Sequence, residues 1–187
     1  MKKLISVLIS LILIVSVLPS CAERKVSGTP LPPSDWAAEY ITKAENMGIT
    51  RGFSAVKNPW ARPIRREAFC HLLFNTIKDS GLIGTDKKTF SDTDDERILR
   101  LAASGFIEGV SDTEFDPDGL ITREEAAVLL SRTAGKMALA ATEIYFILSD
   151  EDEISDWAEN GVQHTLNLGF MKGIGESAFD PKGSLTA

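Results

Sequence analysis

Apolar residues recur at helical spacing in several segments of the chain. Three of these segments, each fourteen residues long, end with a glycine. Residues 35–48 (DWAAEYITKAENMG) place Trp36, Tyr40, Ile41 and Ala44 three to four positions apart. This spacing predicts an amphipathic helix. Its opening aspartate is a natural N-cap, and the closing glycine is a natural C-terminal stop.

Two later segments of the same length have the same form. Residues 92–105 (DTDDERILRLAASG) keep the apolar pattern without tryptophan, and residues 156–169 (DWAENGVQHTLNLG) open again on Asp-Trp-Ala. Asp156 followed by Glu159 fits a capping box, in which two side chains satisfy helix-start N–H groups. We therefore expect a helix in each segment.

These segments belong to a longer repeat. In each copy a second glycine follows the first by four residues, and an aliphatic residue follows the second glycine by twelve. The aligned positions are Gly48, Gly52 and Ile64 in copy one, Gly105, Gly109 and Ile121 in copy two, and Gly169, Gly173 and Leu185 in copy three. The glycines are expected to stop helices and form turns at positive φ.

A second kind of helix follows the aliphatic anchor in the first two copies. Residues 65–77 and 122–137 carry it, and Thr122 with Glu125 forms a capping box. Its predicted buried stripe in copy two is Ala126, Leu129, Leu130 and Thr133.

The pattern predicts a mostly α-helical protein of three helix-loop-helix repeats. A single unit is too small to bury its apolar faces, so packing three together would supply the core. We place the repeats at residues 34–80, 87–137 and 147–187, the last incomplete, after a polar, proline-rich linker at residues 23–33.

The N-terminus has the form of a signal peptide. Lys2 and Lys3 precede an apolar and serine run that ends in small residues, so residues 1–22 are expected to be removed. Two ways of processing are open. The signal peptide is cleaved after Ala22, or a lipobox-like sequence directs lipidation of Cys21. No second such run follows, so we expect no transmembrane helix in the mature chain.

Charge and composition exclude several functions. The formal net charge of −7 becomes −9 when Lys2 and Lys3 leave, which disfavours nucleic acid as a partner. The sequence contains no nucleophile elbow, metal-spaced His/Cys cluster or phosphate-binding glycine loop, so we expect neither an enzyme nor a cofactor. Cys70 is expected to be a small buried residue.

Several of these features together resemble the S-layer homology domain of bacterial surface proteins. They are the opening Asp-Trp-Ala, the Gly-x-x-x-Gly turn, Phe-x-Pro, and Ile-Thr-Arg-x-Glu, and the most specific stretch is FDPDGLITREEAAVLL at residues 115–130. The resemblance covers residues 34–187.

The resemblance implies a non-catalytic anchor at the bacterial cell wall or surface. Three repeats would pack pseudo-threefold, and grooves between them would bind a pyruvylated secondary cell-wall polysaccharide or a peptidoglycan-linked polymer. The motif arginine that recognises the anionic polymer corresponds to Arg123 in copy two and Arg66 in copy one.

Elementary physics gives the same site independently. A helix N-terminus, here at Thr122, offers N–H groups to an anion, and arginine adds a planar fork suited to a carboxylate. On this basis we expect Arg123→Ala to weaken wall binding without unfolding the protein. Further candidate ligand-binding residues are Trp36 and Trp157, which are also candidate core anchors, and the turn glycines Gly52 and Gly109.

Copies one and three depart from the motif. Copy one has Arg65 and Ala68 in place of the threonine and second glutamate, and copy three ends with Ala187 at the arginine position. Either the sequence is a fragment or its third unit is degenerate.

A calcium-dependent or protein-interaction module is the alternative. The stretch EFDPDGLITREE has acidic residues near EF-hand spacing, but copies one and three lack the same set. The candidate ligands are Glu114, Asp116, Asp118 and Glu125.

Overall fold

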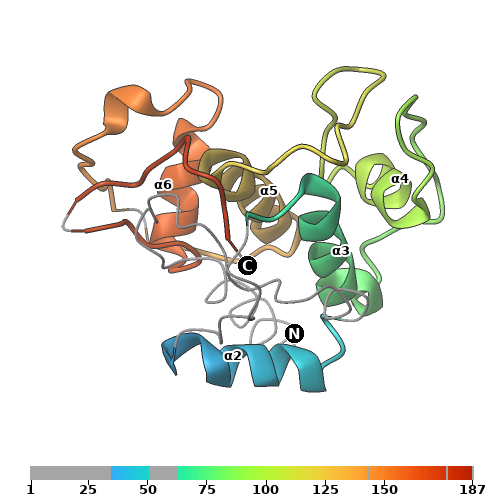
Figure 1. The fold of residues 1–187 in the computed structure, drawn as a ribbon, viewed down its shortest axis with the longest axis horizontal. Helices are drawn as coiled ribbons and strands as arrows, with labels where there is room; N and C mark the ends of the chain where they lie inside the picture. Colours follow the sequence, from blue (N-terminus) through green and yellow to red (C-terminus); the bar gives the residue numbers. More distant parts are fainter. Residues whose placement is uncertain (1–34, 51–62, 143, 176, 187) are drawn as a thin grey trace, which may run out of the picture.

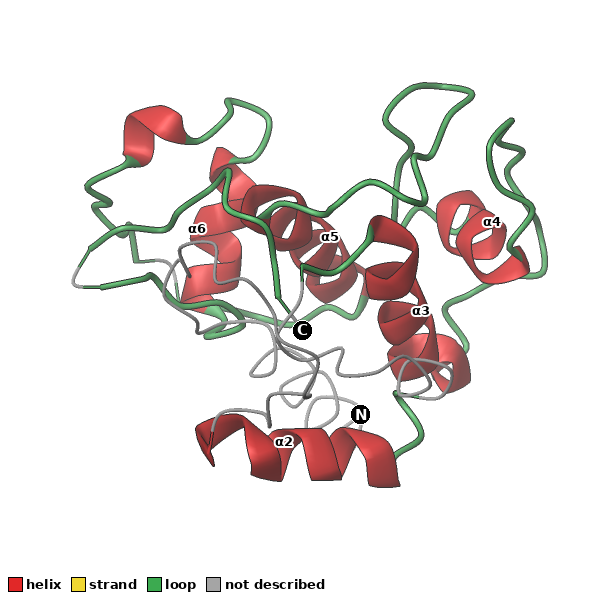
Figure 2. Ribbon diagram, in the orientation of Figure 1, coloured by secondary structure: helices red, strands yellow, loops and turns green. Residues whose placement is uncertain are grey.

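A computed structural model describes residues 35–50, 63–142, 144–175 and 177–186 of the chain. The α-helices are α2 (Asp35–Asn46), α3 (Arg66–Ile77), α4 (Glu96–Ala103), α5 (Arg123–Lys136) and α6 (Glu159–Asn167), and two short 3₁₀ helices are η2 (Lys78–Ser80) and η3 (Glu151–Glu153). Long loops join them, and no strand longer than an isolated bridge occurs in the described ranges (Figure 2). The prediction of a mostly α-helical protein is confirmed.

The helices are arranged around a central pair. Helices α3 and α5 lie in the middle of the molecule, α4 flanks α3, and α6 flanks α5 (Figure 1). Helix α2 runs along one end. The core includes Ile98 and Leu101 of α4 and Leu130 of α5, all at most 1% exposed. The predicted stripe of α5 is buried throughout.

Helix α6 begins later than the sequence predicts. Its first residue is Glu159, and its N-cap is Ala158, which makes no side-chain cap hydrogen bond. The predicted capping box from Asp156 to Glu159 is therefore wrong, because residues 156–158 form a turn that precedes the helix. Gly161 brings this helix close to α5: a Cβ there would lie 2.8 Å from Val128 Cγ2.

Three short extended segments meet at a closed ring of backbone hydrogen bonds. Ile64 N donates to Leu185 O at 2.8 Å, Leu185 N donates to Ile121 O at 3.0 Å, and Ile121 N donates to Ile64 O at 3.1 Å. All three side chains are at most 3% exposed. These residues are the aliphatic anchors of the sequence repeat, so equivalent positions in sequence meet at one point in space.

Two loops are held by aspartates in the same way. The Asp92 carboxylate accepts hydrogen bonds from Phe115 N and Asp116 N, and the Asp150 carboxylate accepts them from Phe179 N and Asp180 N. The hydrogen bond from Phe115 N leads the causes that lower the pKa of Asp92. Counted back from the helix-ending glycines, Asp156 occupies the position of Asp92. By its hydrogen bonds, however, Asp150 is the counterpart of Asp92.

Candidate functional site: a groove beside Arg66

The Arg66 side chain lies inside the protein and links α3 to a distant loop. Its Nε donates to Phe115 O at 3.1 Å, and its Nη2 donates to Glu108 O at 3.2 Å. Its guanidinium carbon lies 5.0 Å from the centre of the Phe115 ring, within the range of a cation–π contact. The residue is 6% exposed, so most of this arginine is used within the fold.

Arg123, at the corresponding position of α5, makes the same kinds of contact as Arg66. Its Nε donates to Phe179 O at 2.7 Å, its Nη2 donates to Lys172 O at 2.8 Å, and its guanidinium carbon lies 4.8 Å from the Phe179 ring centre. Burial lowers the pKa of Arg123, although the charges of Asp150 and Asp180 oppose this. Arginine nonetheless remains charged at neutral pH.

The backbone N–H groups at the starts of α3 and α5 are also occupied. Arg66 N and Glu67 N donate to Gly119 O and Pro117 O, at 2.8 and 3.1 Å. Arg123 N and Glu124 N donate to Gly183 O and Pro181 O, at 2.9 and 3.0 Å. The expectation that the helix N-terminus at Thr122 offers these donors to an anion is therefore wrong, because a neighbouring loop accepts from its first two N–H groups.

Thr122 acts as a helix cap. Its Oγ1 accepts from Glu125 N at 3.3 Å, while Glu125 Oε2 accepts from Thr122 N at 2.8 Å, which confirms the predicted capping box. The other carboxylate oxygen, Oε1, accepts from Arg66 Nη1 at 3.0 Å. Glu125 thus caps α5 and pairs with the arginine of α3.

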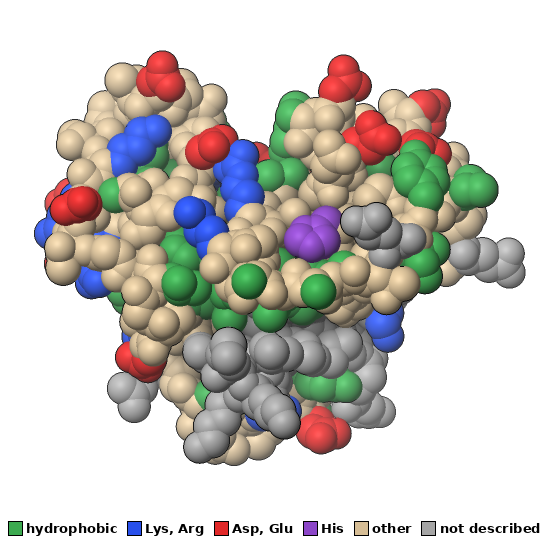
Figure 3. Space-filling model, turned by 180° about the vertical axis from the view of Figure 1, so that it is seen from behind, with side chains coloured by type: hydrophobic (Ala, Val, Ile, Leu, Met, Phe, Trp, Pro, Cys, Tyr) green, Lys and Arg blue, Asp and Glu red, His purple; other side chains and the backbone are tan. Residues whose placement is uncertain are grey.

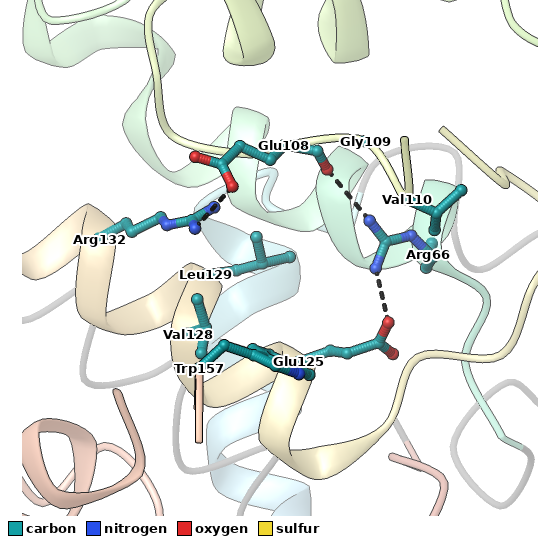
Figure 4. A pocket seen from close by; sticks show the side chains of 9 residues that line it. All are labelled: Arg66, Glu108, Gly109, Val110, Glu125, Val128, Leu129, Arg132 and Trp157. Atoms are coloured by element: carbon teal, nitrogen blue, oxygen red, sulfur yellow. Dashed lines mark hydrogen bonds and ion pairs between the residues drawn. The ribbon is translucent and has the colours of Figure 1, made fainter. Parts of the chain in front are cut away.

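A groove of about 380 Å³ opens beside this ion pair. Figure 4 shows Arg66 and Arg132 on opposite sides of it, with Leu129 between them. Seen from behind, the molecular surface is hollowed between two lobes, with acidic and basic side chains near one another at the edge (Figure 3). The lining residues are Arg66, Glu108, Gly109, Val110, Glu125, Val128, Leu129, Arg132 and Trp157.

Trp157 lies at this groove and is 59% exposed. Its exposure shows that it is no core anchor, which follows from its place in the turn before α6. An exposed indole offers a flat apolar face with a polar N–H. The side chain of Trp36 and the whole of Gly52 lie outside the described residues.

Gly109 is a close-approach glycine. A Cβ there would lie 2.3 Å from Glu114 O and 2.6 Å from Ser111 O. Gly173 is similar, since its Cβ would lie 2.7 Å from Ala178 O. Positive φ is confirmed at the helix-ending glycines Gly48, Gly105 and Gly169. Gly109 and Gly173 do not have positive φ; at these positions glycine is favoured because a Cβ would clash with a backbone oxygen.

The structure does not gather the alternative calcium ligands. Asp118 forms an ion pair with Arg65, and Glu125 is taken by Arg66 and the α5 cap. Asp116 accepts a hydrogen bond from Gly119 N through its side chain. Within the described ranges, no group of three or more His, Cys, Asp or Glu side chains is placed to hold a metal ion.

Cys70 is buried, as predicted. Desolvation raises the pKa of its thiol to about 12, although the charge of Arg66 opposes this. The thiol is therefore protonated at neutral pH and is a poor nucleophile. Its neighbour His71 contacts Asp95 at 3.0 Å, between Nε2 and Oδ2.

Two charged groove residues, Glu108 and Arg132, were missed from the sequence. Arg132 lies seven positions after Glu125 on α5, so helical periodicity places both on the face that also carries Val128 and Leu129. This signal was available for Arg132. Glu108 precedes the second glycine of its copy and carries no comparable signal.

The protein is thus a helical module in which two arginines bind carbonyls of loops far away in the sequence. An open groove lined by charged and apolar side chains lies beside one of them, Arg66. Residues 85–127 match the S-layer homology domain family. An S-layer homology domain is a cell-surface anchoring module and is not itself catalytic. Domains of this family bind cell-wall polymers and occur in proteins of the cell surface or wall.

Three similar proteins carry enzyme names. The chain is 28% identical over 158 residues to an amylopullulanase of Thermoanaerobacterium thermosulfurigenes, and 27% identical over 161 residues to an exoglucanase of Acetivibrio thermocellus; each alignment covers 81% of the chain. It is 26% identical to an endoglucanase of Bacillus sp. (strain KSM-635) over 199 residues, covering 99% of the chain. These alignments cover only 8%, 14% and 21% of the respective relatives.

Among the described residues, no helix has the length and apolar character needed to cross a membrane.

Proposed function

We propose that the chain attaches to an anionic, pyruvylated secondary cell-wall polymer through three S-layer-homology repeats packed pseudo-threefold. The ring of hydrogen bonds among Ile64, Ile121 and Leu185 supports this packing, because the three equivalent anchors bind one another in a cycle. The repeat bounds at residues 34–80, 87–137 and 147–187 are part of the proposal. So is export, with residues 1–22 as the signal peptide; in the alternative, cleavage before Cys21 would leave that cysteine as the lipid attachment point.

The groove beside Arg66 is the observation that carries the proposal. It combines two guanidinium groups, an aliphatic floor and the exposed Trp157. Sugar rings pack their apolar faces on aromatic side chains, while arginine pairs with a carboxylate through a planar fork. An acidic polysaccharide presents both features, and a neutral polysaccharide lacks the second.

The structure redistributes the roles expected from sequence. Arg66, Gly109 and Trp157 line the groove. Arg123 and Thr122 do not line it: the first holds a loop in place and the second caps α5. We therefore assign polymer contact to the groove residues and a supporting role to Arg123.

The test is co-sedimentation of the exported protein with purified Gram-positive cell walls, before and after chemical removal of the pyruvylated polymer. We expect binding that disappears with the polymer. Trp157→Ala should reduce binding, whereas Tyr145→Ala should not, because Tyr145 is 56% exposed but does not line the groove. Equal sedimentation with both wall preparations, or with neither, would refute the proposal and point to a protein partner.

A further inference from the structure

Glu108 connects the two arginines of the groove. Its backbone carbonyl accepts from Arg66 Nη2 at 3.2 Å, and its carboxylate accepts from Arg132 Nη2 at 2.8 Å. Both interactions are drawn in Figure 4. The backbone of this residue therefore serves the fold, while its side chain neutralises a cation at the groove.

The two arginines differ in how firmly they are held. The Arg66 side chain is 7% exposed and binds two carbonyls and the Glu125 carboxylate. The Arg132 side chain is 34% exposed and pairs with Glu108, whose side chain is 70% exposed. An exposed ion pair of this kind contributes little and exchanges readily with other partners.

The corresponding position elsewhere in the chain carries the opposite charge. Lys172 O accepts from Arg123 Nη2 as Glu108 O accepts from Arg66 Nη2. The shared backbone contact does not require a carboxylate, because lysine makes it equally well. The Glu108 side chain is thus unnecessary for this contact and is explained better by its pairing with Arg132.

We infer that Arg132 is the residue that binds the anionic group of the wall polymer, and that Glu108 is a built-in competitor that occupies Arg132 until the polymer displaces it. This inference rests on the proposed function and names the specificity-determining pair within its site. Arg66 faces the same groove, but its exchange would break a buried pair with Glu125. The ligand therefore takes the cation that is least costly to release.

Opposite effects are expected from neutralising the two partners. Glu108→Gln removes the competitor and should tighten binding roughly two- to fivefold, the range set by a weak exposed pair. Arg132→Gln removes the charged donor and should weaken binding about tenfold or more. Arg132→Lys should fall between, because lysine keeps the charge without the planar fork. The double variant should bind like Arg132→Gln alone.

The measurement is titration calorimetry of the exported protein with soluble, pyruvylated polymer fragments released from purified walls. Glu114→Gln and Lys87→Gln are matched controls, since they make the same charge changes at residues that do not line the groove. Thermal melting should be nearly unchanged in all these variants, which separates ligand contact from structural support.

The outcomes separate the two proposals. If the wild-type protein binds the fragments but Arg132→Gln binds equally well, or Glu108→Gln binds no more tightly than Glu114→Gln, the inference fails and the proposed function stands. If the wild-type protein does not bind, the proposed function fails and the inference fails with it.

Discussion

The Arg66 guanidinium and the Glu125 carboxylate lie 3.0 Å apart and join two residues separated by 59 positions in the sequence. Their side chains are only 7% and 26% exposed. The same glutamate closes the cap of α5 through its other oxygen. One carboxylate thus fixes both the start of a helix and the position of its neighbour.

Removing this pair should destabilise the protein. We expect Arg66→Ala to lower the free energy of unfolding by about 3 kcal/mol, because it leaves Glu125 partly buried without its cation. Urea denaturation measures the change. Arg65→Ala is the matched control: its partner Asp118 is exposed, so its loss should be less than about 1 kcal/mol. Equal losses in the two variants would contradict a buried role for Arg66.

Arg123→Ala should also reduce stability, an effect that the sequence alone did not indicate. It removes hydrogen bonds to Phe179 O and Lys172 O and a contact with the Phe179 ring. Unpaired buried acceptors cost about 1–3 kcal/mol, so thermal melting should shift clearly downward. Lys172→Ala keeps the accepting carbonyl and should melt like the wild-type protein. An unchanged melting temperature in Arg123→Ala would restore the simpler ligand-binding role.

Gly161→Ala tests the contact between α5 and α6. Alanine favours a helix over glycine by about 1 kcal/mol, but its Cβ would lie 2.8 Å from Val128 Cγ2 and 3.1 Å from Val128 Cα. Overpacking costs about 1–3 kcal/mol, so chemical denaturation should show a net loss of roughly 1 kcal/mol.

The control for this variant lies on the adjoining helix. Gly135 of α5 has open space around its Cβ position and no positive φ. Gly135→Ala should therefore stabilise the protein by about 0.5–1 kcal/mol. Stabilisation by both substitutions would show that α6 can move away from Val128 at no cost.

Acid should destabilise the contact between α3 and α4 in two stages. Burial lowers the pKa of His71 below its ordinary value of 6.5, with help from the charge of Arg97. The unfolded chain then binds the proton more readily, so stability falls as pH drops below about 6.5. Desolvation opposes ionisation of Asp95, but Arg97 and His71 outweigh it and bring that pKa from 3.8 to about 2. Stability held by ionised Asp95 is lost as pH falls from about 4 to about 2.

Circular dichroism melts across pH measure both stages. His71→Gln should remove the upper stage, and Asp95→Asn should remove the lower one. Asp95→Asn should also lower stability at neutral pH, because Asp95 Oδ1 accepts from Arg97 N at the start of α4. A pH profile identical to wild type in His71→Gln would contradict the first assignment.

Local chemistry was predictable from the sequence where short-range interactions decide the outcome. The capping box of Thr122 and Glu125 and the buried stripe of α5 follow from spacing within one helix. Helix ends at Gly48, Gly105 and Gly169 follow from the positive φ that glycine accepts readily. The capping prediction failed at Asp156, because residues 156–158 form a non-helical turn where the sequence pattern was equally compatible with the first turn of a helix.

The hydrogen-bond partners of long side chains could not be predicted from the sequence in the same way. Nothing near Arg123 in the sequence shows that its guanidinium reaches Phe179 O, because that contact spans 56 positions. The loops that take the helix-start N–H groups are equally distant. The sequence therefore located the arginines of the motif but not the groove, whose exposed pair, Glu108 and Arg132, lies outside that motif.

The ring at Ile64, Ile121 and Leu185 also constrains the order in which the chain can fold. Among the residues that the structure describes, Ile64 N donates to Leu185 O, and Leu185 N in turn donates to Ile121 O. No two of these segments satisfy all three donors without the third. A chain emerging N-terminus first therefore keeps Ile64 N, just before α3, without this acceptor until residue 185 has emerged, and the ring closes only then.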